Sequence, residues 1–370
     1  MYQRCKRCIM DNASDGSIRF DSEGYCNYCN DVLKRLPTEY FPNDGDKRLH
    51  EIIKRIKEDC KDNEFDCMVG ISGGLDSSYI MYLGHKFGLR MIAVHIDDGL
   101  DNPIAVENIE KLIQKTGSKY ISIQPDRKEY ADVIYALLKA SVSNLAIAQD
   151  NLILKALQQY GEKNGIKYIL DGSNMAHESI LERGTGGVDS NDRKFIREVH
   201  KRFGRIPLKN LEFMSITERY IGRHTRKGFK HIRPLNYMDY QIDKALIELK
   251  EFCDFKYYGG KHYESILTRY MQCYYLPHKF EIDKRKSHFS SLIISGQMTR
   301  DEALDKLKQP TYLSNQMYEE DRRFLADYLN ISINEFEELV EQPPKKERDY
   351  PHSILNEFAP IARKFRKVLE

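Results

Sequence analysis

The chain lacks long apolar runs. Nothing in its 370 residues approaches the roughly 20 apolar positions that a membrane-spanning helix needs. The N-terminus, from Met1 to Cys5, has no apolar core of the kind found in signal peptides. We therefore expect a cytoplasmic protein with no membrane partner. In a reducing compartment its eight cysteines are not expected to form disulfides.

Tryptophan is also absent, and the net charge is small. The aromatic mass comes from 24 tyrosines and 16 phenylalanines, and 58 basic residues nearly balance 56 acidic ones, leaving +2. A dedicated nucleic-acid binder usually shows an obvious basic excess, so we expect no nucleic-acid partner, although local basic patches stay open. A length of 370 residues with 41% hydrophobic residues predicts two or three structural units with a normal core.

Strands and helices are predicted to alternate in the first half of the chain. Apolar runs predict strands at 65–71, 91–96, 119–123 and 167–170. Periodic or capped stretches predict helices at 46–60, 77–87, 103–116 and 129–163, the last one broken near 141–144. This alternation predicts an α/β fold, a parallel sheet with helices on both faces. Ligands of such sheets bind at the carboxyl ends of the strands, where the loops at 72–78, 97–102 and 171–178 fall.

The segments outside this region have a different character. Residues 1–45 are rich in turns and cysteine, and the glycine-rich stretch at 183–187 predicts a mobile loop. After about Gln241 the sequence is nearly all helical and rich in Tyr, Lys and Arg. We therefore expect an N-terminal module at 1–45, an α/β domain at 46–240, and a helical region at 241–370 that closes over substrate or phosphates.

Four cysteines near the N-terminus form two C-x-x-C pairs. Seventeen residues separate Cys5 and Cys8 from Cys26 and Cys29, a spacing that favours one tetrahedral zinc ion. Four thiolates leave no open position, so the Zn²⁺ would be structural and would supply folding free energy to a short module. An iron–sulfur cluster, or two unconnected pairs of buried or redox cysteines, are the alternatives. The isolated cysteines are expected in the core: Cys60, Cys67, Cys253 and Cys273.

Residues 72–78 read Ser-Gly-Gly-Leu-Asp-Ser-Ser, between a predicted strand and a predicted helix. Free N–H groups, the helix dipole, two permissive glycines and the serine hydroxyls predict a phosphate site there. The stretch lacks the Gly-Lys-[Ser/Thr] ending of the Walker A loop and is not G-x-G-x-x-G. A carboxylate at Asp76 suits an Mg²⁺ ion that bridges phosphates. An ordinary helix start with Ser and Asp caps is the alternative.

This stretch resembles the PP-loop, S-G-G-x-D-S, of ATP pyrophosphatases that share the adenine nucleotide alpha hydrolase-like fold. Those enzymes adenylate an oxygen of their substrate, and the loop grips the pyrophosphate that leaves. Residues 172–178 are similar to the family's G-x-N-x-x-D-E, with His177 in place of Asp. The resemblance implies Asp76 and Glu178 as Mg²⁺ ligands, although Glu178 could instead be a solvated helix residue. It implies these ATP contacts: Ser72, Gly73, Gly74, Asp76, Ser77, Ser78, His95, Asp97, Gly172 and Asn174.

Three stretches carry a closer resemblance, to the N-acetyl sugar amidotransferases of surface-polysaccharide and lipopolysaccharide biosynthesis. They are "CIMDNASDGSIRFDSEGYCNYC" at 8–29, "GISGGLDSSY" at 70–79 and "GGKHYESILTRYMQCYYLPHKFEIDKRKSHFSSLIISGQMTRDEAL" at 259–304. The resemblance implies an ATP-dependent enzyme that converts the N-acetyl group of a sugar to an acetamidino group. ATP adenylates the amide oxygen, and ammonia then displaces AMP. No glutaminase module is visible, so ammonia is expected from a separate glutaminase subunit or from solution.

Further residues are predicted to act on this reaction. Asp76 and Ser77 are expected catalytic residues at the loop, and Lys279 and Arg285 in the basic stretch 278–286 are expected to contact phosphates or an anionic part of the sugar. A solvated basic face is the alternative for that stretch, and for Lys261 and His262. Arg269 is expected to form a salt bridge rather than to bind sugar.

Two other functions stay open. A tRNA-modifying, thiolation-type PP-loop enzyme usually needs cysteines near the third or fourth strand, and this chain has none between 68 and 252. A non-catalytic nucleotide-binding or zinc-mediated interaction protein is the third possibility.

Overall fold

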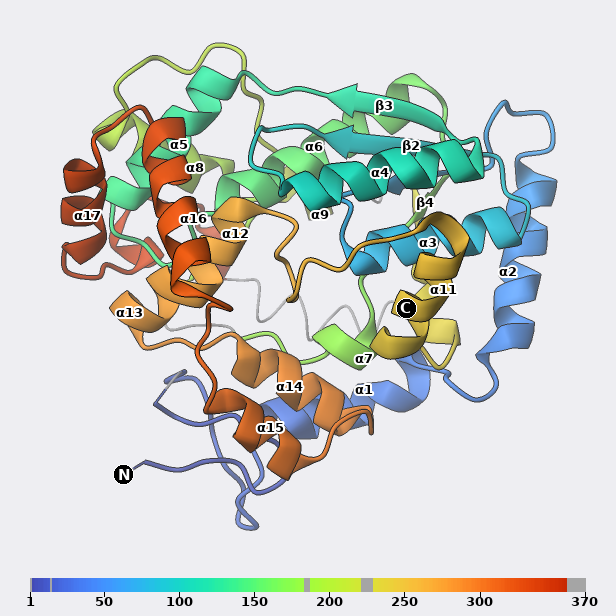
Figure 1. The fold of residues 1–370 in the computed structure, drawn as a ribbon, viewed down its shortest axis with the longest axis horizontal. Helices are drawn as coiled ribbons and strands as arrows, with labels where there is room; N and C mark the ends of the chain where they lie inside the picture. Colours follow the sequence, from blue (N-terminus) through green and yellow to red (C-terminus); the bar gives the residue numbers. More distant parts are fainter. Residues whose placement is uncertain (1, 14, 183–186, 221–228, 358–370) are drawn as a thin grey trace.

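A parallel sheet organises the computed structural model, which describes residues 2–13, 15–182, 187–220 and 229–357 (Figure 1). Within these residues five strands pair in the order β3-β2-β1-β4-β5. Their bounds are β1 Cys67–Gly70, β2 Met91–Ile96, β3 Lys119–Ile123, β4 Tyr168–Leu170 and β5 Lys230–Ile232. The four predicted strands are confirmed, and so is the predicted α/β fold class. The fifth was missed because three residues, Lys-His-Ile, are too short to show a period.

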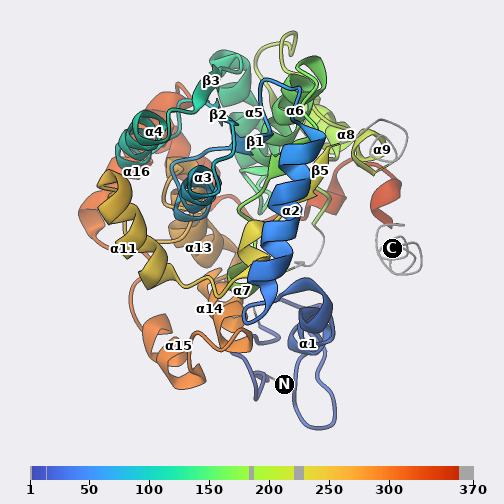
Figure 2. The same cartoon turned by 90° about the vertical axis from the view of Figure 1, so that its right-hand side faces the viewer.

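Helices cover both faces of the sheet. Successive side chains of a strand point to opposite faces, and here the side chains on both faces are apolar. In β1, Cys67 and Val69 pack with α2 and α3, whereas Met68 packs with Leu157 of α6. Figure 2 shows α3 and α4 on one side of the strands and α6 on the other. The helices of this layer are α2 Gly45–Asp59, α3 Leu75–Lys86, α4 Pro103–Thr116, α5 Arg127–Lys139 and α6 Ile147–Lys163.

The N-terminal segment contains a helix that the sequence did not predict. α1 (Asn27–Glu39) begins at Cys26, whose sulfur accepts a hydrogen bond from the N–H of Cys29. The helix contains Pro37, and turn-forming residues precede it, so its apolar period is hard to see. The module packs against α7 (Met175–Glu178) and α14 (Arg285–Ile294).

The C-terminal region is nearly all helix, as predicted. α12, α16 and α17 share a hydrophobic core with α5 and α8, so these helices pack beside the sheet layer (Figure 1). None of the described helices is long and apolar enough to cross a membrane. Residues 183–186 of the predicted mobile loop lie outside the described residues. The remaining helices are α8 Arg193–Phe203, α9 Ile216–Tyr220, α11 Ile242–Cys253, α12 Ile266–Tyr270, α13 Leu276–Phe280, α15 Arg300–Leu307, α16 Asn315–Tyr328 and α17 Ile333–Glu341.

One turn of π-helix, Met271–Tyr275, joins α12 to α13. Pro277 follows it and has no N–H to give to the carbonyl of Cys273, four residues earlier. The Thr311 hydroxyl donates to that carbonyl instead, at 2.5 Å. The bond ties the segment after α15 to a helix that lines the main cavity of the protein.

Candidate active site

The loop after β1 has the geometry of an anion site. Gly73 has φ +70°, and a Cβ there would lie 2.2 Å from the carbonyl oxygen of Ala105, so only glycine fits. The N–H of Ser72 donates to the Ser77 hydroxyl and the N–H of Gly74 to the Ser72 hydroxyl, each at 3.2 Å. A hydroxyl that accepts a hydrogen bond still has its own proton to donate. These groups stand at the start of α3, where the helix dipole favours an anion.

Two carboxylates beside the loop converge on one cation. The Nζ atom of Lys261 lies 3.5 Å from Oδ2 of Asp76 and 2.8 Å from Oε1 of Glu178. Oδ1 of Asp76 accepts a hydrogen bond from the Tyr240 hydroxyl at 2.6 Å. Burial opposes ionisation of Asp76, but Lys261 and His177 outweigh it and hold the pKa below its usual value. Carboxylate oxygens are ligands that Mg²⁺ takes, so Asp76 and Glu178 are of the right chemical type for that ion.

The loop after β4 brings the second carboxylate into place. A Cβ at Gly172 would lie 3.1 Å from the backbone carbon of Asp76, so the two loops touch. The side chain of Asn174 accepts a hydrogen bond from the N–H of His177 at 2.9 Å and so caps α7. Asn174 therefore supports the short helix that carries Glu178.

His177 stands where the family pattern has an acid. Its Nδ1 lies 3.9 Å from Oδ1 of Asp76 and its Nε2 lies 3.2 Å from Oε1 of Gln297. Burial lowers its pKa, although Asp76 raises it in part, which favours a neutral ring at neutral pH. The departure from the family pattern leaves Asp76 and Glu178 as the carboxylates of this cluster.

The end of β2 carries the predicted nucleotide contacts. Nδ1 of His95 donates to the carbonyl of Ile71 at 2.8 Å, and its Nε2 lies 3.1 Å from Oδ2 of Asp101. His95 lines the cavity described below, and so does Asp101. Asp97 does not, because its carboxylate pairs with Arg127 at 2.7 Å and with Gln124. The acid at this edge is therefore Asp101 and not the predicted Asp97.

Ser78 also differs from its predicted role. Its side chain is fully buried, and its hydroxyl has no hydrogen-bond partner among the described residues. Of the three serines only Ser72 lines the cavity, and the part-buried Ser77 hydroxyl lies 3.2 Å from the Ser72 hydroxyl.

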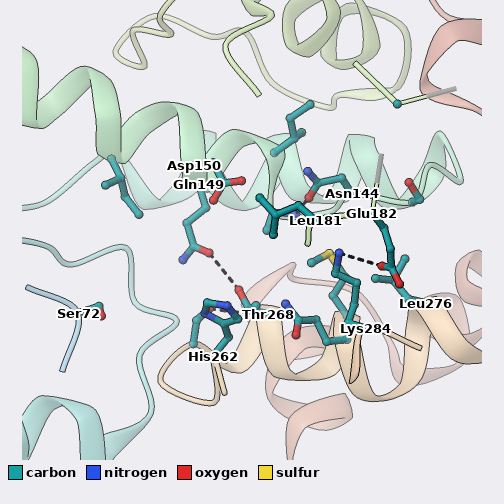
Figure 3. Close-up of a pocket in the computed structure, with 18 of the residues that line it drawn as sticks. Ser72, Asn144, Gln149, Asp150, Leu181, Glu182, His262, Thr268, Leu276 and Lys284 are labelled. Carbon is teal, nitrogen blue, oxygen red and sulfur yellow. Dashed lines mark hydrogen bonds and ion pairs between the residues drawn. The ribbon is translucent and has the colours of Figure 1, made fainter. Parts of the chain in front are cut away.

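A cavity of about 1100 Å³ extends from this edge of the sheet into the C-terminal helices. Ligand pockets are usually about 300–1000 Å³, so this one has room for ATP and a second reactant. Figure 3 shows Ser72 at one side and Leu276 with Lys284 at the other. The lining residues from the C-terminal region include Glu264, Thr268, Met271, Leu276, Lys279 and Lys284.

The basic stretch divides between the cavity and the scaffold. Lys279 lines the cavity, and burial lowers its pKa to about 8. Lys284 also lines it and lies 3.1 Å from a carboxylate oxygen of Glu182. Arg285 does not line it, because its guanidinium binds Asp283 and the carbonyls at 306, 307, 309 and 310, where α15 ends. Arg285 is therefore a helix cap here, and we remove it from the predicted catalytic set.

The four N-terminal cysteines form one closed cluster. All four sulfurs lie within 4.8 Å of one another, with Cys5–Cys29 at 3.7 Å and Cys8–Cys26 at 3.6 Å. A zinc ion with Zn–S bonds of about 2.3 Å sets tetrahedral S···S edges of about 3.8 Å. An iron–sulfur cluster, with one thiolate on each of several irons, would hold the sulfurs farther apart. The geometry therefore fits a single structural zinc ion.

The cysteine cluster lies behind the wall of the site. Arg300 donates to the carbonyls of Cys5 and Cys8, and the N–H of Ile9 donates to Ser290 on α14. Ser291, next on α14, accepts the N–H of Ile180 just after α7. The module thus supports α14 and, through it, the short helix α7 that carries His177 and Glu178.

Sequence reasoning undervalued several residues of this site. From the sequence, Lys261 could equally bind the ligand or lie on a solvated basic face. Its position between two carboxylates is a tertiary contact that no local pattern shows. Glu264 lies in the same stretch as Lys261 and lines the cavity, where one of its oxygens has no partner in the described structure. Tyr240 had no sequence signal. Arg269 forms the predicted salt bridge, with Asp321, but in a buried position.

Comparison with known families identifies the C-terminal part. Residues 264–363 match the family model described as "LPS biosynthesis protein WbpG-like, C-terminal domain". This stretch of the C-terminal region is thus similar to that domain. This domain begins at Glu264 and supplies Thr268, Lys279 and Lys284 to the same cavity that Ser72 lines. A search of curated proteins found no match.

Solved structures with a similar course of the chain include three enzymes. A U34-tRNA thiolase, NcsA, from Methanococcus maripaludis with a [4Fe-4S] cluster is 13% identical, with 92% of this chain and 89% of that chain covered and a TM-score of 0.34. The NMN synthetase from Francisella tularensis is 13% identical, with 78% and 93% covered and a TM-score of 0.35. The NH3-dependent NAD synthetase from Campylobacter jejuni is 19% identical, with 56% and 84% covered and a TM-score of 0.30.

The Ser-Gly-Gly-Leu-Asp-Ser loop at the carboxyl end of β1 and the carboxylates beside it form a site that suits a phosphate group and a cation. The substrate that is activated there does not follow from the loop, which serves the leaving group and not the acceptor.

Proposed function

We propose that the protein is an ATP-dependent amidotransferase that converts the N-acetyl group of a sugar to an acetamidino group for surface-polysaccharide biosynthesis. One observation carries the proposal: the WbpG-like domain and the PP-type loop line a single cavity. A domain named for lipopolysaccharide biosynthesis thus supplies the wall that faces the ATP site. The acceptor in this proposal is an N-acetylated sugar, either nucleotide-linked or free.

The residues beside the loop have two tasks in the first step. Ser72, Gly73 and Ser77 would hold the pyrophosphate end of ATP by hydroxyl and backbone groups. Asp76 and Glu178 would hold Mg²⁺, which neutralises charge on the leaving pyrophosphate when it is bound. Lys261 then has a phosphate oxygen within reach of its ammonium group. The amide oxygen of the acceptor attacks the α-phosphorus, and the bond to pyrophosphate breaks.

The second step needs a shielded place. The adenylated amide is an imidate, and water would return it to the starting amide. Ammonia must reach its carbon first, so that the C–O bond to AMP breaks and an amidine forms. The helices around Thr268 and Lys279 form the part of the cavity that is distant from the loop and would enclose this reaction. A separate glutaminase subunit is the proposed source of ammonia.

A tRNA thiolation function is the second candidate, and the position of the cysteines argues against it. Sulfur transfer needs a cysteine near the activated base, and no cysteine lines the cavity in the described part of the chain. The four-cysteine cluster is fully buried, and its sulfurs are too close together for an iron–sulfur cluster. Amidotransfer needs no thiol, so it agrees better with this site.

The test is one incubation without RNA. The protein is mixed with ATP, Mg²⁺, ¹⁵N-ammonium chloride and a panel of free and nucleotide-linked N-acetyl sugars, and products are read by mass spectrometry. We expect AMP, pyrophosphate and one sugar in which oxygen is replaced by ¹⁵N-labelled NH. AMP formation that needs tRNA and ignores every sugar would favour the thiolation function. No AMP under any condition would favour a non-catalytic protein.

A further inference from the structure

Asp150 presents a carboxylate to the cavity without a protein partner. It lies in the first turn of α6 and lines the cavity, and its side chain makes no hydrogen bond or ion pair with any described residue. The next residue back, Gln149, behaves differently: its Nε2 donates to Asp98 at 2.6 Å. Asp98 also accepts the N–H of Leu100 at 3.0 Å and is therefore satisfied. Asp98 is thus buried and paired within the protein, whereas Asp150 is exposed to the cavity and has no partner among the described residues.

The surroundings of Asp150 suit a cation. In Figure 3 Asp150 and His262 lie on opposite walls, between Ser72 on one side and the Lys284–Glu182 pair on the other. Glu264 lines the same part of the cavity, and its Oε2 has no hydrogen-bond partner in the described structure. The anion-holding loop lies at one end and Lys279 and Lys284 at the other, so the middle is the acidic part of the cavity.

His262 has an unusual backbone for its residue type. Its φ is +63°, a left-handed conformation that a residue with a Cβ adopts at a cost of about 1–3 kcal/mol. Its Nδ1 lies 3.6 Å from Oε1 of Glu264, and its ring centroid lies 5.6 Å from that of His288, with the two rings tilted by 57°. The strained loop therefore places an imidazole across the cavity from Asp150.

Amidine formation requires a proton acceptor at such a place. When the lone pair of ammonia bonds to the imidate carbon, the attacking nitrogen gains a positive charge and keeps three protons. It must lose one proton before its lone pair can expel AMP, with the C–O bond electrons going to the AMP phosphate. The other nitrogen keeps the proton that it had in the amide throughout, so the amidine product carries one positive charge. A carboxylate beside this nitrogen serves both needs.

We propose that Asp150 takes the proton from the attacking nitrogen and holds the amidinium group that forms. The inference rests on the proposed function and names a catalytic residue for its second step. The side chain of Asp150 is exposed to the cavity. The surrounding fold raises the pKa of its carboxyl group and His262 opposes that rise, so the group is ionised at neutral pH and can accept a proton. Its proton then passes to cavity water. The other ionisable group that Asp150 acts on is Tyr130 of α5, whose pKa burial raises.

The first test needs no sugar. Acetamidinium chloride, which carries the functional group of the product, is titrated into the full-length protein and followed by saturation-transfer NMR, with sodium chloride holding ionic strength constant. We expect Asp150→Asn to weaken binding at least tenfold and Asp150→Glu, which keeps the charge, to retain it within about threefold. The matched control is Asp305→Asn, which removes an exposed acid of α15 and is expected to change nothing. Equal binding by wild type and Asp150→Asn would overturn the proposal.

The second test separates the two half-reactions. Exchange of labelled pyrophosphate into ATP, in the presence of the accepted sugar, reports adenylation without ammonia. We expect Asp150→Asn to keep exchange within about twofold and to lose amidine formation about 100-fold, with partial rescue by hydroxylamine, which is uncharged at neutral pH. An equal loss of exchange and amidine formation would overturn the assignment, since a purely structural role moves both. Failure of wild-type exchange with every sugar would instead count against the proposed function, and the acetamidinium result would stand apart from it.

Discussion

At the scale of single residues, Lys261 joins parts of the chain that are far apart in sequence. Its ammonium group lies between Asp76 of the loop and Glu178 of α7, and both carboxylates raise its pKa against the opposing effect of burial. A cation fixed beside the loop is positioned for a phosphate oxygen before ATP arrives, and such preorganised charge is a large term in phosphoryl and adenylyl transfer.

Substitution of this lysine tests that role. Lys261→Met removes the charge and keeps most of the side-chain volume, so we expect AMP formation to fall by about 10²–10³-fold. Lys256→Met is the matched control, because Lys256 is exposed and pairs only with the surface acid Glu107 among the described residues. An unchanged rate of AMP formation in Lys261→Met would show that the two carboxylates act without it.

Lys279 offers a prediction about pH. Burial lowers its pKa to about 8 from the usual 10.5, so the folded protein binds fewer protons than the unfolded chain between these values. Below pH 8 the charged lysine costs stability, and this cost fades as the pH rises toward 10.5. Lys279→Met should therefore raise the urea midpoint at pH 7 but not at pH 10.5, while lowering amidine formation about tenfold through loss of a charge-assisted contact.

The opposite pH trend would show that Lys279 is stabilising as a cation. If Lys279→Met gained stability and kept full activity, the charge of Lys279 would destabilise the fold without serving the reaction. Lys279 would then be removed from the proposed site. The comparison uses one substitution at two pH values, so each protein is its own control.

The residue scale is also where prediction from sequence was weakest. The loop residues and the cysteines follow from local spacing, because their geometry is set within a few positions of the chain. Asp97 was predicted because it directly follows β2, and only the tertiary structure shows that Arg127 pairs with it. Arg285 was predicted to bind phosphate because of its charge, whereas its guanidinium pairs with Asp283 and with carbonyl groups more than about 20 residues away.

At the scale of elements, most of the sheet and its helices could be predicted. The helix at 103–116 has matching bounds because Asn102 caps one end and Gly117, with φ +64°, ends the other. The strands at 91–96 and 119–123 also match. α1 was missed because a cysteine of the metal site, rather than a usual capping residue, precedes it. β5 was missed because it has only three residues. Their stability comes from tertiary contacts that local propensity does not contain.

The cap on α15 gives a prediction at this scale. Arg285→Met leaves several carbonyls of the last turn without their donor and leaves Asp283 unpaired, so we expect a loss of about 2 kcal/mol in the free energy of unfolding. AMP formation measured well below the melting temperature should stay within about twofold. Urea unfolding and initial rates on the same sample check both parts. A large fall in rate without a fall in stability would return Arg285 to the catalytic set.

At the scale of the whole molecule, the zinc module and the active site share two helices. α7 carries His177 and Glu178, and both α7 and α14 pack against the module that holds the cysteine cluster (Figure 1). In the described structure the module therefore supports one wall of the site. Loss of the metal should disturb the position of the carboxylate of Glu178.

Metal removal checks this arrangement. A zinc-selective chelator, applied with excess Mg²⁺ present, should lower the melting temperature by more than about 5 °C and lower AMP formation in parallel. Added zinc should restore both, and Cys26→Ser should reproduce the chelated state. A soluble zinc-free protein with full activity and unchanged melting would contradict the structural assignment of the cluster.

The central claim is that ATP is split here to make an amide oxygen leave a sugar. The most direct measurement uses an accepted sugar whose N-acetyl oxygen is ¹⁸O, incubated with ATP, Mg²⁺ and ammonium chloride. The account predicts that the ¹⁸O appears in the phosphate of AMP, one atom for each amidine formed, and that pyrophosphate stays unlabelled. AMP without ¹⁸O, or ADP in place of AMP, would contradict it.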